Sequence, residues 1–146
     1  MTGEYLLEGL AVPETLDLLH DLLEKVGHEH PDLDAGDLMM FETAVIEVAG
    51  NVVEHGRPPG DVTWAFRLSV LPDRLEAQLS DSGEEYPGGT WGTSMPADLL
   101  QEDGRGLALA TAVLDALEYE RFGDANHWTM RRRRAQRYRR QPHPFR

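Results

Sequence analysis

The stretch Glu47-Val-Ala-Gly-Asn51-Val-Val-Glu-His55-Gly56 is the most informative part of this 146-residue chain. It ends an apolar-periodic run that begins near Leu38 and predicts an amphipathic helix. Glu47 and Asn51 are four residues apart, so on a helix they share one face, a turn from each other. A face of this kind would place a general base beside a carbonyl oxygen that can coordinate a metal.

Two glycine-bearing loops follow that helix. Asp81-Ser82-Gly83 ends an alternating segment, and its carboxylate can accept a hydrogen bond from an exocyclic amine such as that of adenine. Gly104-Arg105-Gly106 precedes a second apolar-periodic segment, and backbone amides at the start of a helix bind phosphate. The Arg105 guanidinium can reach a terminal phosphate. Each loop alone also fits an ordinary turn or helix entry, but the three segments together indicate a nucleotide site.

The net charge is strongly negative and unevenly distributed. The chain has 14 lysines and arginines against 26 aspartates and glutamates, for a net charge of −12. Residues 131–146 contain eight arginines and no acid, so residues 1–130 hold 6 basic and 26 acidic residues. A body this acidic repels nucleic acid, and we expect no direct nucleic-acid partner. The acidity fits either a partner with a basic surface or solubility alone.

Composition and the ends of the chain suggest a soluble protein. There is no cysteine, hence no disulfide, and no apolar run approaches the roughly 18 residues needed to cross a bilayer. The N-terminal residues show no basic region followed by an apolar one, so we expect no signal peptide, no membrane contact and a cytoplasmic location. The spacing of His20, His28 and His30 is not that of a metal site, and we expect them on the surface.

The pattern of apolar residues predicts an α/β fold. We expect strands over 5–10, 62–70, 74–80 and 116–122, with a turn over 123–126 and a return strand from His127. We expect helices from Pro13 to a C-cap at Gly27, from Asp34 or Asp37 to His55, and over 107–117. This order predicts a two-layer α/β sandwich with a mixed, mostly antiparallel sheet and helices on one face. Residues 1–134 would form one domain, and 135–146 a basic, disordered tail.

These motifs resemble those of the GHKL (Bergerat-fold) ATPases, whose domain is that of the histidine kinases, and most closely those of the anti-sigma factor serine/threonine kinases. Glu47-x-x-x-Asn51 is similar to the N box of that family, and Asp81-x-Gly83 to its G1 box. Gly104-x-Gly106-Leu107 is similar to the G2 box. The resemblance covers roughly residues 4–134, and the order and spacing of the boxes are more specific than any one of them.

The resemblance implies a nucleotide site with ATP and Mg²⁺ as cofactors. Glu47 would be the general base that takes the proton from an attacking serine hydroxyl, and Asn51 would coordinate Mg²⁺. Asp81 would contact the adenine amine, with Gly83 beside the base. The phosphates would be lined by Gly104, Arg105, Gly106 and Leu107, and residues 84–103 would form a lid over the nucleotide.

The resemblance also implies protein partners. The phosphoacceptor would be a serine on an anti-sigma factor antagonist, and the second partner would be a sigma factor. Whether the chain forms a homodimer stays open.

Three alternatives remain open from the sequence. Glu85 stands where fuller G1 boxes carry a second glycine, and the acidic Glu84 precedes it, so a pseudo-kinase that binds partners without turning over ATP is one alternative. The second is the ATPase domain of a two-component sensor kinase, although the chain is too short to include a dimerisation hairpin as well. The third is an unrelated structural α/β domain in which the three boxes occur by coincidence.

Overall fold

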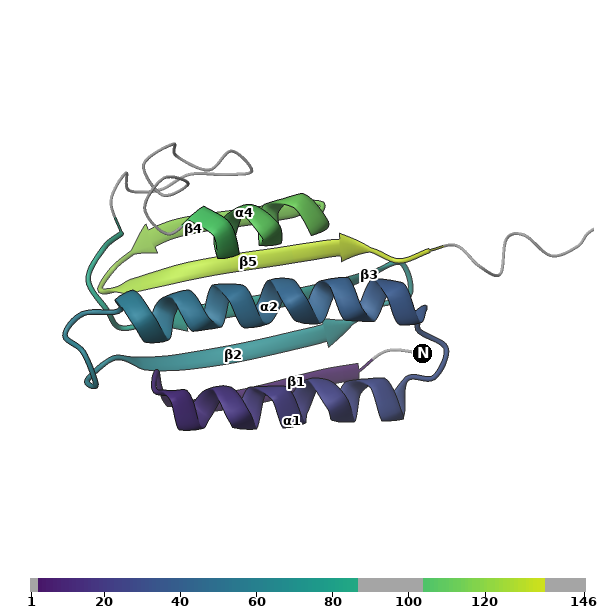
Figure 1. Cartoon of the computed structure of the whole chain (residues 1–146), viewed down its shortest axis with the longest axis horizontal. Coiled ribbons are helices and arrows are strands. Elements are labelled where there is room, and N and C mark those ends of the chain that lie inside the picture. The colour runs from purple at the N-terminus through teal and green to yellow at the C-terminus, as the bar shows by residue number, and fades with distance from the viewer. Residues whose placement is uncertain (1–2, 87–103, 136–146) are drawn as a thin grey trace, which may run out of the picture.

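A computed structural model describes residues 3–86 and 104–135 of the chain. The elements run along the chain as β1 Gly3–Leu10, α1 Pro13–Glu29, α2 Ala35–His55, β2 Thr63–Val70, β3 Arg74–Asp81, α4 Gly104–Val113, β4 Ala116–Phe122 and β5 Ala125–Arg133. Figure 1 shows the helices lying lengthwise over the strands. Most of the lid expected over 84–103, and residues 136–146 of the expected tail, lie outside the described residues.

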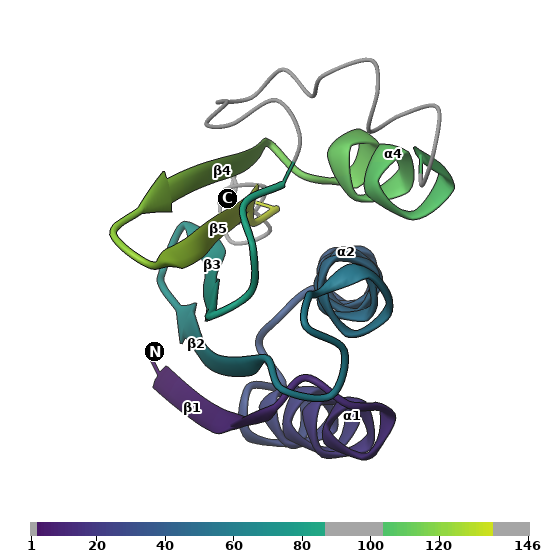
Figure 2. The same cartoon turned by 90° about the vertical axis from the view of Figure 1, so that its left-hand side faces the viewer.

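The five strands form one sheet in the order β1-β2-β3-β5-β4. Helices α1, α2 and α4 all lie on the same face of this sheet (Figure 2). The predicted two-layer α/β sandwich with helices on one face is therefore confirmed. The pairing differs from the mixed sheet that we expected, because all four pairs of neighbouring strands are antiparallel. Strands β3 and β4 run in the same direction, but β5 lies between them and separates them.

Alternation along the central strands determines which side chains enter the core. In β2, every second residue from Trp64 to Val70 is buried against the helices. In β3, the buried positions are Leu75, Ala77, Leu79 and Asp81, all on the same face. The period of two therefore carries a carboxylate into the interior at the end of β3, since Asp81 continues the apolar series.

Helix α1 begins where the sequence predicts but ends later. Pro13 occupies its first turn, and the helix continues through Gly27 to Glu29. A Cβ at Gly27 would lie 3.1 Å from Leu38 Cδ2, so this glycine serves the close approach of α1 to α2. The expected C-cap at Gly27 is therefore wrong. The surface position of His30 is also wrong, since its side chain is buried and its ring lies edge-on against Tyr5 at 6.1 Å.

Helix α2 has the ends that the sequence predicts. The Asp34 carboxylate accepts a hydrogen bond from the Asp37 backbone N–H at 3.0 Å, so Asp34 is the N-cap. The helix ends at His55, and the Gly56 N–H donates to the Val52 carbonyl at 2.8 Å. Although α2 has 21 residues, neither it nor any other helix in the described ranges is long and apolar enough to span a bilayer.

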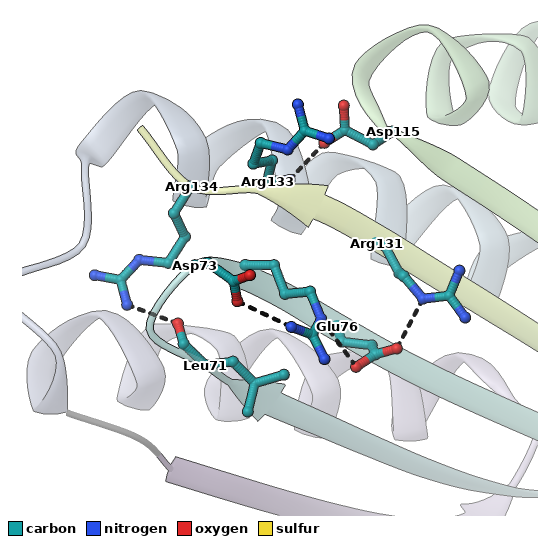
Figure 3. Close-up of polar contacts among 8 residues, drawn as sticks. Leu71, Asp73, Glu76, Asp115, Arg131, Arg133 and Arg134 are labelled. Atoms are coloured by element: carbon teal, nitrogen blue, oxygen red, sulfur yellow. Dashed lines mark hydrogen bonds and ion pairs between the residues drawn. The ribbon is translucent and has the colours of Figure 1, made fainter. Parts of the chain in front are cut away.

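The arginine-rich end of β5 is held to the domain through Arg134, the residue that ends the expected domain. Arg131 Nε donates to Glu76 Oε2 at 2.8 Å, and Arg134 Nη1 donates to the Leu71 carbonyl at 2.8 Å (Figure 3). Arg134 Nη2 also lies 2.9 Å from the Asp32 carboxylate, and only 11% of the Arg134 side chain is exposed. These acceptors come from the β2–β3 turn, from β3 and from the α1–α2 loop, so the end of β5 is fixed by both layers.

Ionisation of the Tyr5 hydroxyl makes the free energy of unfolding depend on pH in the alkaline range. It donates to Glu29 Oε1 at 2.6 Å, and partial burial followed by this hydrogen bond raises the pKa of Tyr5 from 10.0 to about 12. Because the folded pKa is the higher one, the stabilisation is complete below pH 10 and decreases as the pH rises toward 12. The free energy of unfolding should therefore fall more steeply over this interval in the wild type than in Tyr5→Phe. Chemical denaturation at several pH values measures both slopes, and equal slopes would contradict the coupling.

Candidate functional site

The predicted base and metal ligand lie on the second half of α2. Asn51 is buried, and Glu47, one turn earlier, is half-buried. Among residues 3–86 and 104–135, no hydrogen-bond partner is found for the Asn51 side chain. Because no such partner occupies it within those ranges, the Asn51 side-chain oxygen is available to a ligand.

Glu47 lies on the edge of a groove of about 540 Å³ between α1 and α2. The groove is acidic, and burial raises the pKa of Glu42 within it, while His20 acts in the opposite direction. Its lining comprises His20, Asp21, Leu23, Glu24, Met39, Glu42, Thr43, Ile46 and Glu47. The half-buried carboxylate of Glu47 is thus next to both the groove and the Asn51 turn of α2.

The Asp81 carboxylate is almost completely buried and accepts three hydrogen bonds. Oδ1 accepts from the Gly83 backbone N–H at 2.9 Å and from Asn126 Nδ2 at 2.8 Å. Oδ2 accepts from Trp128 Nε1 at 3.2 Å. A carboxylate has about four acceptor positions, so one position on Oδ2 is left for a further donor.

The Asp81-Ser82-Gly83 loop packs against the segment that follows α2. The Glu84 N–H donates to the Arg57 carbonyl at 3.0 Å. A Cβ at Gly83 would lie 3.0 Å from Asp81 Oδ1 and 3.4 Å from the Arg57 carbonyl oxygen. Glycine is therefore needed here for close approach, and this approach brings the loop to the C-terminal end of α2. The Glu84 and Glu85 side chains are exposed.

The third segment forms the beginning of α4. Gly104, Arg105 and Gly106 lie in its first turn, and Leu107 is fully buried. The helix extends over 104–113 and not over the predicted 107–117, because the chain turns after Val113 and Leu117 is a buried residue of β4. Helix α4 lies beside α2 in both views (Figures 1 and 2).

The three segments meet at one end of the domain. The C-terminal end of α2 and the start of α4 lie on the left-hand side of Figure 1, and β3 ends on the same side because it runs antiparallel to β2, whose arrow points to the right. The structure therefore brings Asn51, the Asp81–Gly83 loop and the first turn of α4 to the same end of the sandwich. Glu47 lies one turn farther from this end than Asn51.

Sequence patterns missed a buried polar network beside Asp81. We expected Asn126 in a turn, but it lies in β5 and is fully buried. Its Oδ1 accepts from the Tyr119 hydroxyl and, at 3.2 Å, from Arg121 Nη1. Burial raises the pKa of the Tyr119 phenol, which keeps its hydroxyl protonated. One pattern in the sequence could have indicated its position: Asn126 lies two residues before Trp128, so on a strand both side chains point to the inner face of β5.

The residues at this end of the domain fit a nucleotide with Mg²⁺. Residues 3–86 and 104–135 contain no cluster of three histidine, aspartate or glutamate side chains that could hold a metal. A cation here would take the side-chain oxygen of Asn51 together with phosphate and water oxygens, the ligands that Mg²⁺ favours. The first turn of α4 presents backbone N–H groups suited to phosphate.

Comparison with known proteins defines the class. The family model of the histidine kinase-like ATPase domain matches residues 10–132, so the chain belongs to this family. No curated protein matches the sequence.

One solved structure shows the same fold. It is the crystal structure of the RsbU and RsbW domains of Rv1364c from Mycobacterium tuberculosis, which this chain matches with a TM-score of 0.63 and 18% sequence identity. The match covers 90% of this chain but only 32% of that one. At this identity the likeness establishes the fold alone.

Proposed function

We propose that this chain binds ATP with Mg²⁺ and transfers the terminal phosphoryl group to a serine or threonine of a protein partner. The partner would be an anti-sigma factor antagonist, and the chain would also bind and sequester a sigma factor in the cytoplasm. The observation that carries this proposal is the meeting of the α2 end, the Asp81–Gly83 loop and the start of α4 at one end of a histidine kinase-like ATPase domain.

Each side chain of the site has a distinct proposed role. Asp81 accepts the exocyclic amine of adenine on the remaining position of Oδ2, with Gly83 close to the base. Asn51 would coordinate Mg²⁺, and the cation would supply charge neutralisation of the phosphates. The phosphates lie at the first turn of α4, formed by Gly104, Arg105 and Gly106, with Leu107 anchoring that turn in the core. Phosphoryl transfer depends mainly on such positioning and charge neutralisation.

Glu47 is the proposed general base, so its removal tests the kinase activity. With radiolabelled ATP, Mg²⁺ and an antagonist protein, we expect phosphoryl transfer by the wild type. Because positioned general bases contribute roughly 10²–10⁴-fold, Glu47→Ala should lose about that factor in transfer rate while retaining ATP affinity. No transfer by the wild type, with an identical result for Glu47→Ala, would defeat the kinase proposal.

The nature of the partners is supported by two observations. The three boxes resemble those of anti-sigma factor kinases, and the similar fold occurs in a structure that contains an RsbW domain. The net charge of −20 over residues 1–130 opposes binding to nucleic acid. Regulation would therefore act through proteins and not through DNA or a membrane.

A non-catalytic module that binds partners on the same fold is the second candidate. The exposed Glu84 and Glu85 carboxylates directly follow the Asp81–Gly83 loop and disfavour an anionic ligand nearby. Calorimetry with ATP and Mg²⁺ separates the possibilities. Binding with transfer supports the kinase, binding without transfer supports a nucleotide-dependent switch, and absence of binding supports a pseudo-kinase.

Asp81→Asn should change the choice of nucleobase. The substitution replaces a charged acceptor with an amide, and hydrogen bonds to charged groups are worth about 1.5–3 kcal/mol. We therefore expect ATP affinity to fall by roughly tenfold or more, with a smaller loss for GTP. Titrations with both nucleotides measure this difference, and an equal loss for both would contradict contact between Asp81 and adenine.

A further inference from the structure

The orientation of the Asp81 carboxylate depends on the hairpin formed by β4 and β5, which lies outside the three sequence boxes. We propose that Asn126 is a positioning residue that sets the selectivity of the site for a 6-amino purine over a 6-oxo purine. It would act through Asp81 and would not itself need to touch the base. This inference rests on the proposed nucleotide-binding function and adds what determines the choice of base.

The orientation of the Asn126 amide follows from its neighbours. Arg121 can only donate, and its Nη1 lies 3.2 Å from Asn126 Oδ1. The protonated Tyr119 hydroxyl donates to the same oxygen. Because two donors face Asn126 Oδ1, the Asn126 Nδ2 group must point toward the Asp81–Gly83 loop. The network of hydrogen bonds therefore fixes which atom of the Asn126 amide is oxygen and which is nitrogen.

The Nδ2 group of Asn126 then holds several parts of the loop together. It lies 2.8 Å from Asp81 Oδ1, 2.9 Å from the Glu84 carbonyl oxygen and 3.3 Å from the Gly83 carbonyl oxygen. Arg121 Nη1 adds a hydrogen bond to the Gly83 carbonyl at 2.6 Å. The carboxylate and the backbone of the loop therefore share one fully buried support.

This support leaves the Asp81 carboxylate one way to bind a ligand. Oδ1 is occupied by Gly83 N–H and Asn126 Nδ2, and Oδ2 already accepts from Trp128 Nε1. The remaining position on Oδ2 accepts an N–H donor but repels a carbonyl oxygen. A buried carboxylate that cannot rotate discriminates strongly between bases, because a base without a donor at this point leaves the carboxylate oxygen unpaired. A 6-amino purine supplies the donor, whereas a 6-oxo purine presents an acceptor.

Two variants test the positioning role of Asn126 by removing different numbers of its hydrogen bonds. Asn126→Leu has a similar shape but removes every hydrogen bond of the amide. Tyr119→Phe removes only the hydroxyl that donates to Asn126 Oδ1 and accepts from the Tyr86 N–H at 3.0 Å. Gln78→Leu is the matched control, since Gln78 is an exposed amide on β3, on the opposite face of the sheet from Asp81. Dissociation constants for Mg²⁺-ATP and Mg²⁺-GTP are measured by calorimetry on the full chain.

We expect the wild type and Gln78→Leu to share the same preference for ATP over GTP. This preference should fall about tenfold in Asn126→Leu and about threefold in Tyr119→Phe, with most of the change in ATP affinity. A purely structural role would weaken both nucleotides equally and leave the preference unchanged. If Asn126→Leu does not fold, Tyr119→Phe decides the matter alone.

The outcomes separate the inference from the function on which it rests. Failure of the wild type to bind ATP overturns the proposed function and the inference with it. Binding of ATP by the wild type, with an unchanged ATP:GTP preference in both folded variants, overturns only the positioning role of Asn126. A reduced preference in either variant but not in Gln78→Leu supports that role.

Discussion

Replacing Asp37 with alanine is expected to lower the free energy of unfolding by about 3 kcal/mol, because it breaks a largely buried ion pair. Arg132 Nε and Nη2 lie 3.2 and 3.0 Å from Asp37 Oδ1, and the Ala135 N–H donates to Oδ2 at 2.7 Å. Only 8% of the Asp37 side chain and 23% of the Arg132 side chain are exposed. Removing the carboxylate leaves the guanidinium without its counter-charge.

The same pair joins several elements of the domain. Arg132 Nη1 also donates to the carbonyl of Val113, the last residue of α4, at 2.6 Å. The first turn of α2, the end of α4 and strand β5 therefore meet at one guanidinium. Since α4 carries the proposed phosphate-binding turn at its other end, this contact also helps to hold that helix in place.

Thermal and chemical denaturation measure the effect of Asp37→Ala. A loss of about 3 kcal/mol corresponds to a fall in melting temperature of roughly 10 °C for a domain of this size. Asp73→Ala is the control, because the Asp73–Arg74 pair has a similar distance of 2.9 Å but side chains that are 61% and 43% exposed. Exposed pairs contribute about 0–1 kcal/mol, so a loss in Asp37→Ala no larger than in Asp73→Ala would contradict this assignment.

Asn51→Ala is expected to remove most of the Mg²⁺-dependent affinity for ATP while leaving the fold intact. Loss of even an indirect metal contact costs about 10–100-fold in metal affinity, and we expect at least the upper end of that range for a direct ligand. Because no residue within 3–86 or 104–135 hydrogen-bonds to the Asn51 side chain, truncating it breaks no contact of that kind there.

Thr43→Ala provides the control for Asn51→Ala on the same helix. The Thr43 hydroxyl donates to the Met39 carbonyl at 2.9 Å, a contact within α2. ATP affinity in Mg²⁺ should be unchanged in Thr43→Ala and strongly reduced in Asn51→Ala, with similar melting temperatures for both. Wild-type affinity in Asn51→Ala would show that its oxygen does not hold the cation.

Much of the fold follows from local patterns in the sequence. The alternation in 62–70 and 74–80 predicts the β2–β3 hairpin, and Asp34 is a suitable N-cap for α2. The order of the apolar segments predicts the layers of the sandwich. These predictions succeed because hydrophobic periodicity and capping act between residues close in the chain.

The failures involve contacts between distant residues or competing local signals. Gly27 is a good C-cap by type, but close packing against Leu38 keeps it within α1. Asn126 is a common turn residue, yet the turn is completed by Gly123, with a φ of +63°, and Asn126 enters β5. The Asp37–Arg132 pair spans 95 residues of chain, a separation at which no local pattern applies.

The candidate site shows the same division. The sequence predicts Glu47, Asn51, Asp81 and the glycine loops as separate pieces, and the structure adds how they meet. The buried support from Tyr119, Arg121 and Asn126 could not be predicted, because it depends on β5 lying directly beside β3. The functional roles of the site residues stay predictions until nucleotide binding is measured.

The affinity of the wild-type chain for ATP, measured by calorimetry with and without Mg²⁺, tests the central claim most directly. If the end of α2, the Asp81 loop and the start of α4 form one nucleotide pocket, ATP binds with one-to-one stoichiometry and binds much more tightly when Mg²⁺ is present. Absence of ATP binding under both conditions would contradict that claim.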